Sequence, residues 1–396
     1  MTTGRAFVKP MRSRLGSYVT TRVTGEAVKA YMPAPLPPRP PVDLSRLHGR
    51  IELADRAVGR LDGLSSLIPD TNLLLYSYVR KEAVLSSQIE GTQSSLSELL
   101  LFENSAAPGV PVDDVEEVSN YVAAMQHGMR RLRGGFPLSL RLIREMHAIL
   151  LRGGRGSNKT PGEFRRSQNW IGGTRPGNAS FVPPPPNRLM ECLDPFEKFL
   201  HEERGSLPLL VRLGLIHVQF ESIHPFLDGN GRLGRLLITL LLCEKKALRE
   251  PLLYLSLFFK THRDRYYDLL QRVRTEGAWE DWLTFFLEGI ESTAGEVSKA
   301  VRKSLALFAA DRKRIAALGR ASSSALRVQE YMQKRPIANI GAMSKTLRLS
   351  VPTVTAALQH LSRLGIAKEL TGGRRNRVFS YTKYLAMVAA GTEPLR

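Results

Sequence analysis

The residues best suited to chemistry lie together in one segment, residues 224–235, which reads HPFLDGNGRLGR. Gly229, Asn230 and Gly231 tolerate left-handed backbone and close approach, so their N–H groups can wrap phosphate oxygens. The apolar residues 233–242 predict a helix that follows directly, and the start of a helix favours anions. The segment therefore predicts a phosphate-binding loop at a helix N-terminus.

The charged side chains of this segment suit a nucleotide. Arg232 and Arg235 are three positions apart on one helix face, so they can contact different phosphates of one polyphosphate. Asp228 can hold Mg²⁺ through one carboxylate oxygen while substrate phosphates and water supply the other ligands. A histidine titrates near neutral pH, so His224 can act as a general base.

Simpler explanations fit this segment less well. Asp-Gly and Asn-Gly are common in hairpin turns, but the residues that follow predict a buried helix and not a returning strand. A calcium loop would need oxygen ligands where Arg232 and Leu233 stand. His217 lies on the same helix face as His224, but no cysteine or carboxylate cluster completes a metal site. We therefore expect His217 to be a core or supporting residue.

The segment resembles the signature of the Fic family, H-x-F-x-D/E-G-N-G-R-x-x-R, and matches it at every fixed position. The resemblance implies a mainly α-helical fold. It consists of a Fic-type helical core with a short β-hairpin flap, an N-terminal helical extension and a C-terminal winged helix.

The same resemblance implies an activity. His224 would take a proton from a hydroxyl of a target protein, which attacks the α-phosphate of ATP, so that AMP stays on a Ser, Thr or Tyr and pyrophosphate leaves. Asp228 would position Mg²⁺, while Arg232 and Arg235 would bind the β- and γ-phosphates. Further ATP contacts implied by the resemblance are Ile223, Gly229, Asn230, Gly231, Leu233 and Gly234.

Two flanking segments are similar to other parts of the family. Residues 169–182 resemble the flap, which pairs with the target protein by strand addition. Tyr266 and Tyr267 resemble tyrosines that contact the nucleoside, although paired aromatic residues are more often part of a core. These segments add Trp170, Ile171, Gly172, Tyr266 and Tyr267 to the ATP site that the resemblance implies.

An upstream segment resembles the inhibitory motif of the family, S/T-x-x-x-E-G/N, in Ser86, Glu90 and Gly91. Ser86 and Glu90 are four positions apart, so a helix presents both on one face. In relatives this glutamate pairs with the second motif arginine, here Arg235, and fills the space of the γ-phosphate. Ser87 and Glu90 also fit a helix capping box, so both interpretations are open.

Length and composition bound the rest of the chain. Its 396 residues predict two or three domains. Two cysteines in apolar surroundings indicate a reducing interior, and we expect a cytoplasmic protein without membrane contact. The expected divisions are an N-terminal helical domain with the inhibitory motif at 1–110, the Fic catalytic domain at 111–290, a linker helix at 291–320 and a winged helix at 321–396.

Helical periodicity dominates the chain before its C-terminal part. The Pro-rich residues 33–41 predict an extended strap, with an SH3-type ligand as the alternative. The helices predicted from apolar spacing are 44–62, 72–102, 115–133, 138–151 with Ser139 as its cap, 257–274 and 279–309.

The C-terminal part changes in charge and pattern. Residues 320–396 hold 13 Lys and Arg but 3 Asp and Glu, half of the net charge of +20. Helices predicted at 340–347 and 352–364, the second capped by Ser350 and closed by Gly365, precede strands at 366–370 and 378–381. This order resembles a winged helix-turn-helix, which binds DNA or protein. The DNA contacts would be Thr353, Thr355, Gln359 and Arg363 in the major groove and Arg374, Arg375 and Arg377 at phosphates.

Two classes of function stay open at this point. The first is a protein adenylyltransferase that its own Glu90 inhibits, acting on a target or on itself. The second is a DNA-binding regulator whose Fic core senses a nucleotide. A complete motif that includes His224 favours the enzyme, because a sensor needs no base. Within the enzyme class, relatives also remove AMP, and the resemblance further implies a homodimer.

Overall fold

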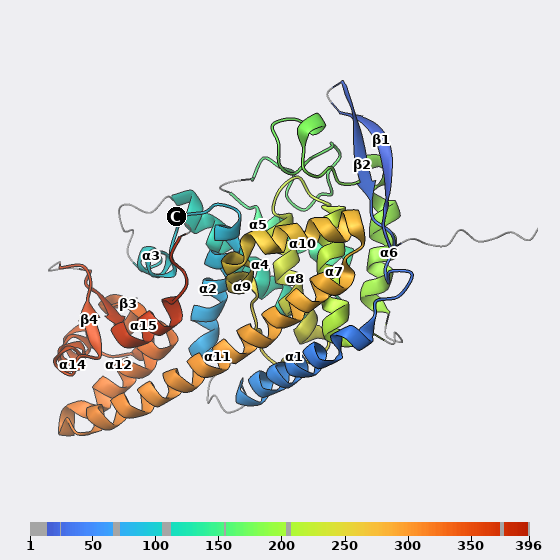
Figure 1. The fold of residues 1–396 in the computed structure, drawn as a ribbon. Coiled ribbons are helices and arrows are strands. Elements are labelled where there is room, and N and C mark those ends of the chain that lie inside the picture. Colours follow the sequence, from blue (N-terminus) through green and yellow to red (C-terminus); the bar gives the residue numbers. More distant parts are fainter. Residues whose placement is uncertain are drawn as a thin grey trace, which may run out of the picture.

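The computed structural model describes residues 14–23, 25–65, 72–104, 112–153, 156–202, 207–372 and 376–394. The fold is mainly α-helical, as predicted, and it contains two small antiparallel sheets (Figure 1). Its elements in chain order are β1 Ser17–Val23, β2 Glu26–Met32, α1 Leu44–Ser65, α2 Asn72–Ile89, α3 Leu96–Phe102, α4 Val112–Arg133, α5 Leu140–Leu150, α6 Leu189–His201, α7 Leu209–Ile223, α8 Asn230–Glu244, α9 Ser256–Thr261, α10 Arg263–Glu276, α11 Trp279–Ala316, α12 Ser322–Lys334, β3 Ile337–Asn339, α13 Ile340–Leu347, α14 Val351–Arg363, β4 Ala367–Glu369, β5 Val378–Tyr381 and α15 Thr382–Ala389.

The core is built around α7 and α8. Both helices are apolar on nearly all sides and almost entirely buried, as expected for helices that neighbours surround. The aromatic side chains of α11 pack on α7, where Trp282 stacks on His217 and its indole N–H donates to the carbonyl of Gly214. This packing holds α7 in place. Helix α7 ends at Ile223, the residue before His224.

One long helix joins the core to the C-terminal elements. Figure 1 shows α11 running diagonally from the core to the part of the molecule that holds α12, α14 and α15. The expected linker helix is therefore the second half of a helix that begins at Trp279.

The predicted helix 72–102 is wrong, because the structure has two helices there. Helix α2 ends at Ile89, and Gly91 follows with a left-handed φ of 106°. Helix α3 starts from a capping box between Ser95 and Glu98, in which each side chain bonds to the backbone of the other. This box satisfies the first N–H groups of α3 and separates the two helices. The predicted helix 257–274 is likewise divided at His262.

The hairpin of β1 and β2 was not predicted. Its strands pair from Ser17 opposite Met32 to Val23 opposite Glu26. Exposed and half-buried positions alternate along most of β1, whereas β2 ends in three consecutive buried residues. The hairpin lies beside the flap, since the N–H of Tyr31 donates to the carbonyl of Val182.

The predicted C-terminal elements are confirmed. Ser350 caps α14 by accepting from the N–H of Thr353, and Gly365 follows the helix with a left-handed φ of 64°. The strands β3, β5 and β4 form one antiparallel sheet in that order. The flanking α12 and α15, and the short strand β3, were not predicted.

Candidate active site

His224 sits where α7 stops. It caps the helix in the left-handed conformation with φ 49°, and its N–H still donates to the carbonyl of Phe220. The ring nitrogen Nδ1 is enclosed and has no hydrogen-bond partner among the described groups. Burial and the nearby Arg165 and Arg274 lower the pKa of His224 to about 3. The ring is therefore neutral at pH 7, which is the form that accepts a proton.

Hydrogen bonds between side chains and backbone groups hold His224 and the residues that follow it. The Arg165 guanidinium, itself 2% exposed, donates through Nε to the His224 carbonyl at 2.9 Å. The side chain of Asn230 accepts from the N–H of Phe226 and donates to the carbonyl of the same residue. Asn230 thus closes the loop through its side chain, and the phosphate contact expected of this residue falls to its backbone N–H.

His147 is a positioning residue that the sequence did not reveal. The N–H of Gly162 donates to its Nδ1, so Nε2 carries the proton and donates to the Asp228 carbonyl at 3.0 Å. The ring stacks on Phe226 with centroids 3.7 Å apart. Burial lowers the pKa of His147 to about 4, so the ring is neutral. Its only signal is a histidine on the apolar face of α5.

The glycine loop has the predicted form. Gly229 precedes α8 with a left-handed φ of 76°, and its N–H donates to Oδ1 of Asp228. A Cβ on Gly231 would lie 2.5 Å from Oε1 of Glu90, so only glycine lets that carboxylate reach the loop. The cradle therefore lies at the N-terminus of α8, and Glu90 occupies its mouth.

Glu90 bridges the two motif arginines. Its Oε1 lies 2.8 Å from Arg235 and its Oε2 lies 3.1 Å from Arg232. Arg235 also donates to the hydroxyl and to the carbonyl of Ser86. Ser86 and Glu90 thus act together on Arg235, while the capping box of this region forms at Ser95 and not at Ser87. Burial lowers the pKa of Arg235, but Glu90 outweighs it and the pKa is raised.

Arg232 has two more carboxylate partners. Oε1 of Glu117, on α4, lies 3.0 Å from the guanidinium, and Oδ1 of Asp228 lies 3.3 Å from it. Glu117 is 5% exposed and also accepts from Thr92. Sequence reasoning missed Glu117, because it stands in a run of acidic residues on a different helix. In the observed arrangement three carboxylates lie against Arg232, the arginine that would bind the β-phosphate according to the family resemblance.

The flap closes through one pair of residues. Ile171 and Phe181 exchange two backbone hydrogen bonds, and Gly172 turns the chain with a left-handed φ of 68°. The side chain of Asn169 donates to the carbonyl of Phe226, which ties the flap to the His224 loop. Trp170 and Ile171 are half-buried beside this contact.

The two tyrosines differ in exposure. Tyr266 is 1% exposed, and its hydroxyl bonds to Nε2 of His217 at 2.9 Å, so it belongs to the core. Tyr267 is 40% exposed. Only Tyr267 presents a ring to a ligand in this arrangement. Ile223, Leu233 and Gly234 are buried and support the loop through packing.

The residues predicted to contact DNA differ in their exposure. On α14, Gln359 and Arg363 are exposed, whereas Thr353 and Thr355 are half-buried. Arg377 is half-buried, and its guanidinium lies over the ring of Phe379. Arg374 and Arg375 lie outside the described residues.

The C-terminal segment, residues 389–393, packs against the helix that carries Ser86. The amide of Gln88 donates to the carbonyls of Ser94 and Thr392, both at 2.8 Å. The ammonium of Lys81 donates to the carbonyl of Ala390. Thr392 is 2% exposed. Helix α2 is thus held by Arg235 on one side and by the C-terminal segment on another.

No group of three or more metal-ligating side chains occurs in the described part of the chain. Asp228 is a single carboxylate at the cradle, so a cation there would need ligands from a bound phosphate. None of the described helices is long and apolar enough to cross a membrane.

Two regions of this chain match family models of Fic proteins. Residues 48–130 match the Fic/DOC family N-terminal region and residues 137–242 match the Fic/DOC family. Protein adenylyltransferase Fic of Aedes aegypti is 34% identical over 249 residues, 60% of this chain and 46% of that protein. The Culex quinquefasciatus protein of the same name is 33% identical over 210 residues, 52% and 39% of the two chains. The chain thus spans less than half the length of these relatives.

Solved structures share the fold. A Fic family protein from Desulfovibrio desulfuricans G20 superposes with a TM-score of 0.56 at 19% identity, over 87% of this chain and 98% of that one. A Fic domain containing signaling protein from Bacteroides thetaiotaomicron VPI-5482 gives 0.51 at 19% identity, over 64% and 97%. At this identity the likeness concerns the fold alone.

Removal of the Glu90 carboxylate should free the two arginines for an anion. We expect Glu90→Ala to bind inorganic pyrophosphate at least about tenfold more tightly than the unaltered chain, a gain of about 1.4 kcal/mol. Isothermal titration calorimetry measures this affinity. Glu116→Ala, at an exposed neighbour of Glu117 on α4, is the matched control and should leave the affinity unchanged. Equal affinities in all three chains would contradict the bridge as described.

Proposed function

Because residues 48–130 and 137–242 match Fic/DOC family models, we propose that the chain is a Fic/DOC protein adenylyltransferase that moves AMP from ATP to a Ser, Thr or Tyr hydroxyl of a protein. The observation that carries this proposal is the position of His224, with its unpartnered Nδ1, beside the glycine cradle and two arginines. A nucleotide sensor needs the cradle and the arginines but has no use for a base.

The geometry supports one order of events. Neutral His224 takes the proton of the target hydroxyl, whose oxygen bonds to the α-phosphorus while the bond to pyrophosphate breaks. The N–H groups at the start of α8 hold phosphate oxygens, and Arg232 and Arg235 take the charge of the β- and γ-phosphates. Catalysis rests on position and charge, as in other phosphoryl-type transfers.

Mg²⁺ fits this site only together with the substrate. Asp228 is the carboxylate that the cradle loop itself supplies, and Mg²⁺ accepts one protein carboxylate when phosphates complete its ligands. The ion would supply neutralising charge to the phosphates. Asp228 would hold the ion, and its pairing with Arg232 keeps the carboxylate in place beforehand.

The observed arrangement is inhibited under this proposal. Glu90 takes the contacts on Arg235 that the γ-phosphate requires, so ATP cannot bind productively until the carboxylate moves away. The Glu90 side chain is 23% exposed, whereas both arginines are 2% exposed, so the glutamate is the partner that can leave. The target would add a strand to the flap, residues 169–182, and Tyr267 would contact the nucleoside. The homodimer and the cytoplasmic location stay predictions.

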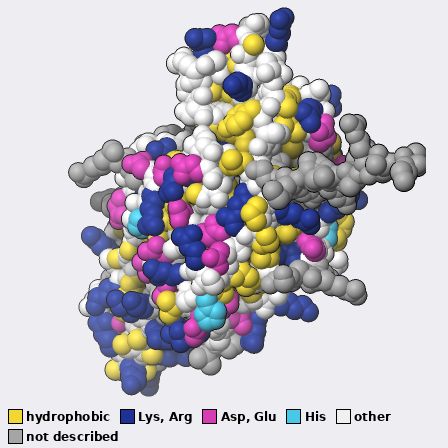
Figure 2. Space-filling view, turned by 45° about the vertical axis from the view of Figure 1, so that its right-hand side comes forward, with side chains coloured by type: hydrophobic (Ala, Val, Ile, Leu, Met, Phe, Trp, Pro, Cys, Tyr) yellow, Lys and Arg dark blue, Asp and Glu magenta, His cyan; other side chains and the backbone are white. Residues whose placement is uncertain are grey.

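A second candidate function is DNA binding by the C-terminal elements, which we interpret as a winged helix. Helix α14 exposes Gln359 and Arg363 and contains no acidic residue. Residues 320–396 carry half of the net charge. A basic surface favours nucleic acid without being specific to it. Figure 2 shows Lys and Arg side chains over the whole visible face, with Asp and Glu among them.

Intact mass tests the adenylyltransferase directly. After incubation with ATP and Mg²⁺, we expect an adduct of one AMP that forms at least about tenfold faster in Glu90→Gly than in the unaltered chain. His224→Ala should form none, because the hydroxyl keeps its proton. Peptide mapping locates the modified residue, and a cell lysate supplies targets. No adduct in Glu90→Gly, on itself or in lysate, would favour the sensor or the removal of AMP.

Truncation tests whether the C-terminal segment supports the inhibited state. A chain that ends at Val388 lacks the carbonyls of Ala390 and Thr392 that Lys81 and Gln88 bind. We expect its adduct to form faster than in the full chain and more slowly than in Glu90→Gly. A chain that ends at Glu393 keeps both carbonyls and should behave like the full chain. Identical rates of adduct formation in the two truncated chains would show that the C-terminal segment does not support the inhibited state.

DNA binding has its own test. We expect Arg363→Ala to weaken binding to a mixed-sequence duplex and to reduce the slope of log affinity against log salt by about 1. Arg60→Ala, at an exposed position of α1, is the control. Fluorescence anisotropy at several salt concentrations gives both quantities. An unchanged slope in Arg363→Ala would exclude α14 as the contact.

A further inference from the structure

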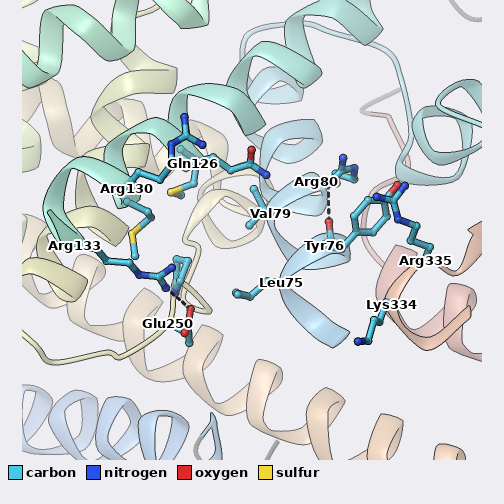
Figure 3. A pocket seen from close by; sticks show the side chains of 13 residues that line it. Leu75, Tyr76, Val79, Arg80, Gln126, Arg130, Arg133, Glu250, Lys334 and Arg335 are labelled. Carbon is cyan, nitrogen blue, oxygen red and sulfur yellow. Dashed lines mark hydrogen bonds and ion pairs between the residues drawn. The ribbon is translucent and has the colours of Figure 1, made fainter. Parts of the chain in front are cut away.

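A cavity lies away from the His224 loop, where α2, α4 and α12 meet (Figure 3). Its volume is about 440 Å³, within the range of small-molecule sites. Side chains from four parts of the chain that are far apart in sequence form its wall, so the cavity exists only while these parts are packed together. The residues that line it are Leu75, Tyr76, Val79, Arg80, Met125, Gln126, Met129, Arg130, Arg133, Glu250, Pro251, Lys334 and Arg335.

The floor of this cavity is apolar. Leu75 and Val79 come from α2, and the buried Met125 and Met129 come from α4. Methionine side chains adapt to flat and irregular ligands and contact aromatic rings favourably. The floor therefore suits an apolar or flat body.

The rim of the cavity is cationic. Figure 3 shows Arg130 and Arg133 of α4 on one side and Lys334 and Arg335 at the end of α12 on the other, with α2 between them. Arg133 pairs with Glu250 at 2.8 Å, and the fifth cation, Arg80, pairs with Glu103 at 2.9 Å. In the described part of the chain no carboxylate pairs with Arg130 or Arg335, so the rim keeps an excess of positive charge.

Tyr76 fixes part of this rim. The guanidinium of Arg80 lies 3.7 Å from the centre of its ring, and that of Arg335 lies 5.2 Å from it. The Tyr76 hydroxyl donates to Glu103 at 2.6 Å, which holds the ring in place. A planar guanidinium held over a ring is suited to bidentate contact with a phosphate.

We propose that this cavity binds a phosphorylated small molecule of nucleotide size. Its flat body lies on the floor formed by Val79, Met125 and Met129, and its phosphate lies at the cationic rim that carries Arg130 and Arg335. Neither an apolar compound nor inorganic phosphate alone satisfies both the floor and the rim.

The ligand would also act on the inhibitory helix. The cavity wall includes the start of α2, and the same helix ends beside Glu90. A ligand that bridges α4, α2 and α12 binds the arrangement in which Glu90 pairs with Arg235, so it stabilises that arrangement. Any loss of transferase activity rests on the proposed function, whereas binding in the cavity does not.

Calorimetry with AMP, adenosine and inorganic phosphate tests the site. We expect AMP to bind at least about tenfold more tightly than either of the others. Arg130→Glu with Arg335→Glu should weaken AMP binding at least about tenfold, since both substitutions reverse a positive charge of the rim. Arg60→Glu with Lys303→Glu changes the net charge equally at exposed positions outside the cavity and should change affinity less than about twofold. These substitutions leave the residues at His224 intact, so AMP bound there contributes equally to all chains.

A further variant, which keeps the net charge, separates the loss of AMP binding from the loss of the fold. Leu75→Trp adds bulk over the floor and should weaken AMP binding as the charge reversal does, while thermal unfolding shows that each variant is folded. Hydrogen exchange of residues 75–90 should slow with AMP in the unaltered chain and not in the charge-reversed one. Unmeasurable AMP binding at millimolar concentration, or binding that the charge reversal leaves unchanged, would overturn the proposal, and neither result depends on transferase activity.

Discussion

Two arginines buried at 2% exposure require counter-charges, and Glu90 supplies one carboxylate to both. Much of the local structure serves this contact. Gly231 has no side chain that would collide with the carboxylate, and Ser86 accepts two further hydrogen bonds from Arg235. Helix α2 ends at Ile89 and the chain turns at Gly91, so the carboxylate of Glu90 between them reaches the start of α8. An ATP phosphate needs these same donors, so one contact both stabilises the fold and blocks the substrate.

The parts that hold this contact come from the whole chain. Glu117 on α4 gives Arg232 a second buried partner, and residues 389–393 bond to Lys81 and Gln88 on α2. The C-terminal elements are therefore packed on the helix that carries the inhibitory residues. Whatever binds or moves those elements has a physical route to Glu90 that runs through hydrogen bonds and packing.

Local chemistry made much of this predictable. Features that depend on residues close together in the sequence were predicted. They are the glycine loop before α8, the caps at Ser139 and Ser350, and the spacing of Ser86 and Glu90. His147 and Glu117 act through partners 81 and 115 positions away, and no local pattern marks such contacts. The single helix predicted over 72–102 failed because the capping box at Ser95 competes with helix continuation.

The measurement that decides most directly is a crystal structure of Glu90→Gly with Mg²⁺ and a non-hydrolysable ATP analogue. We predict phosphate oxygens on Arg235 and Arg232 where the two carboxylate oxygens of Glu90 now lie, with the α-phosphate at the start of α8 facing His224. Phosphates bound elsewhere, or an Arg235 that takes another carboxylate and leaves the cradle closed, would contradict it.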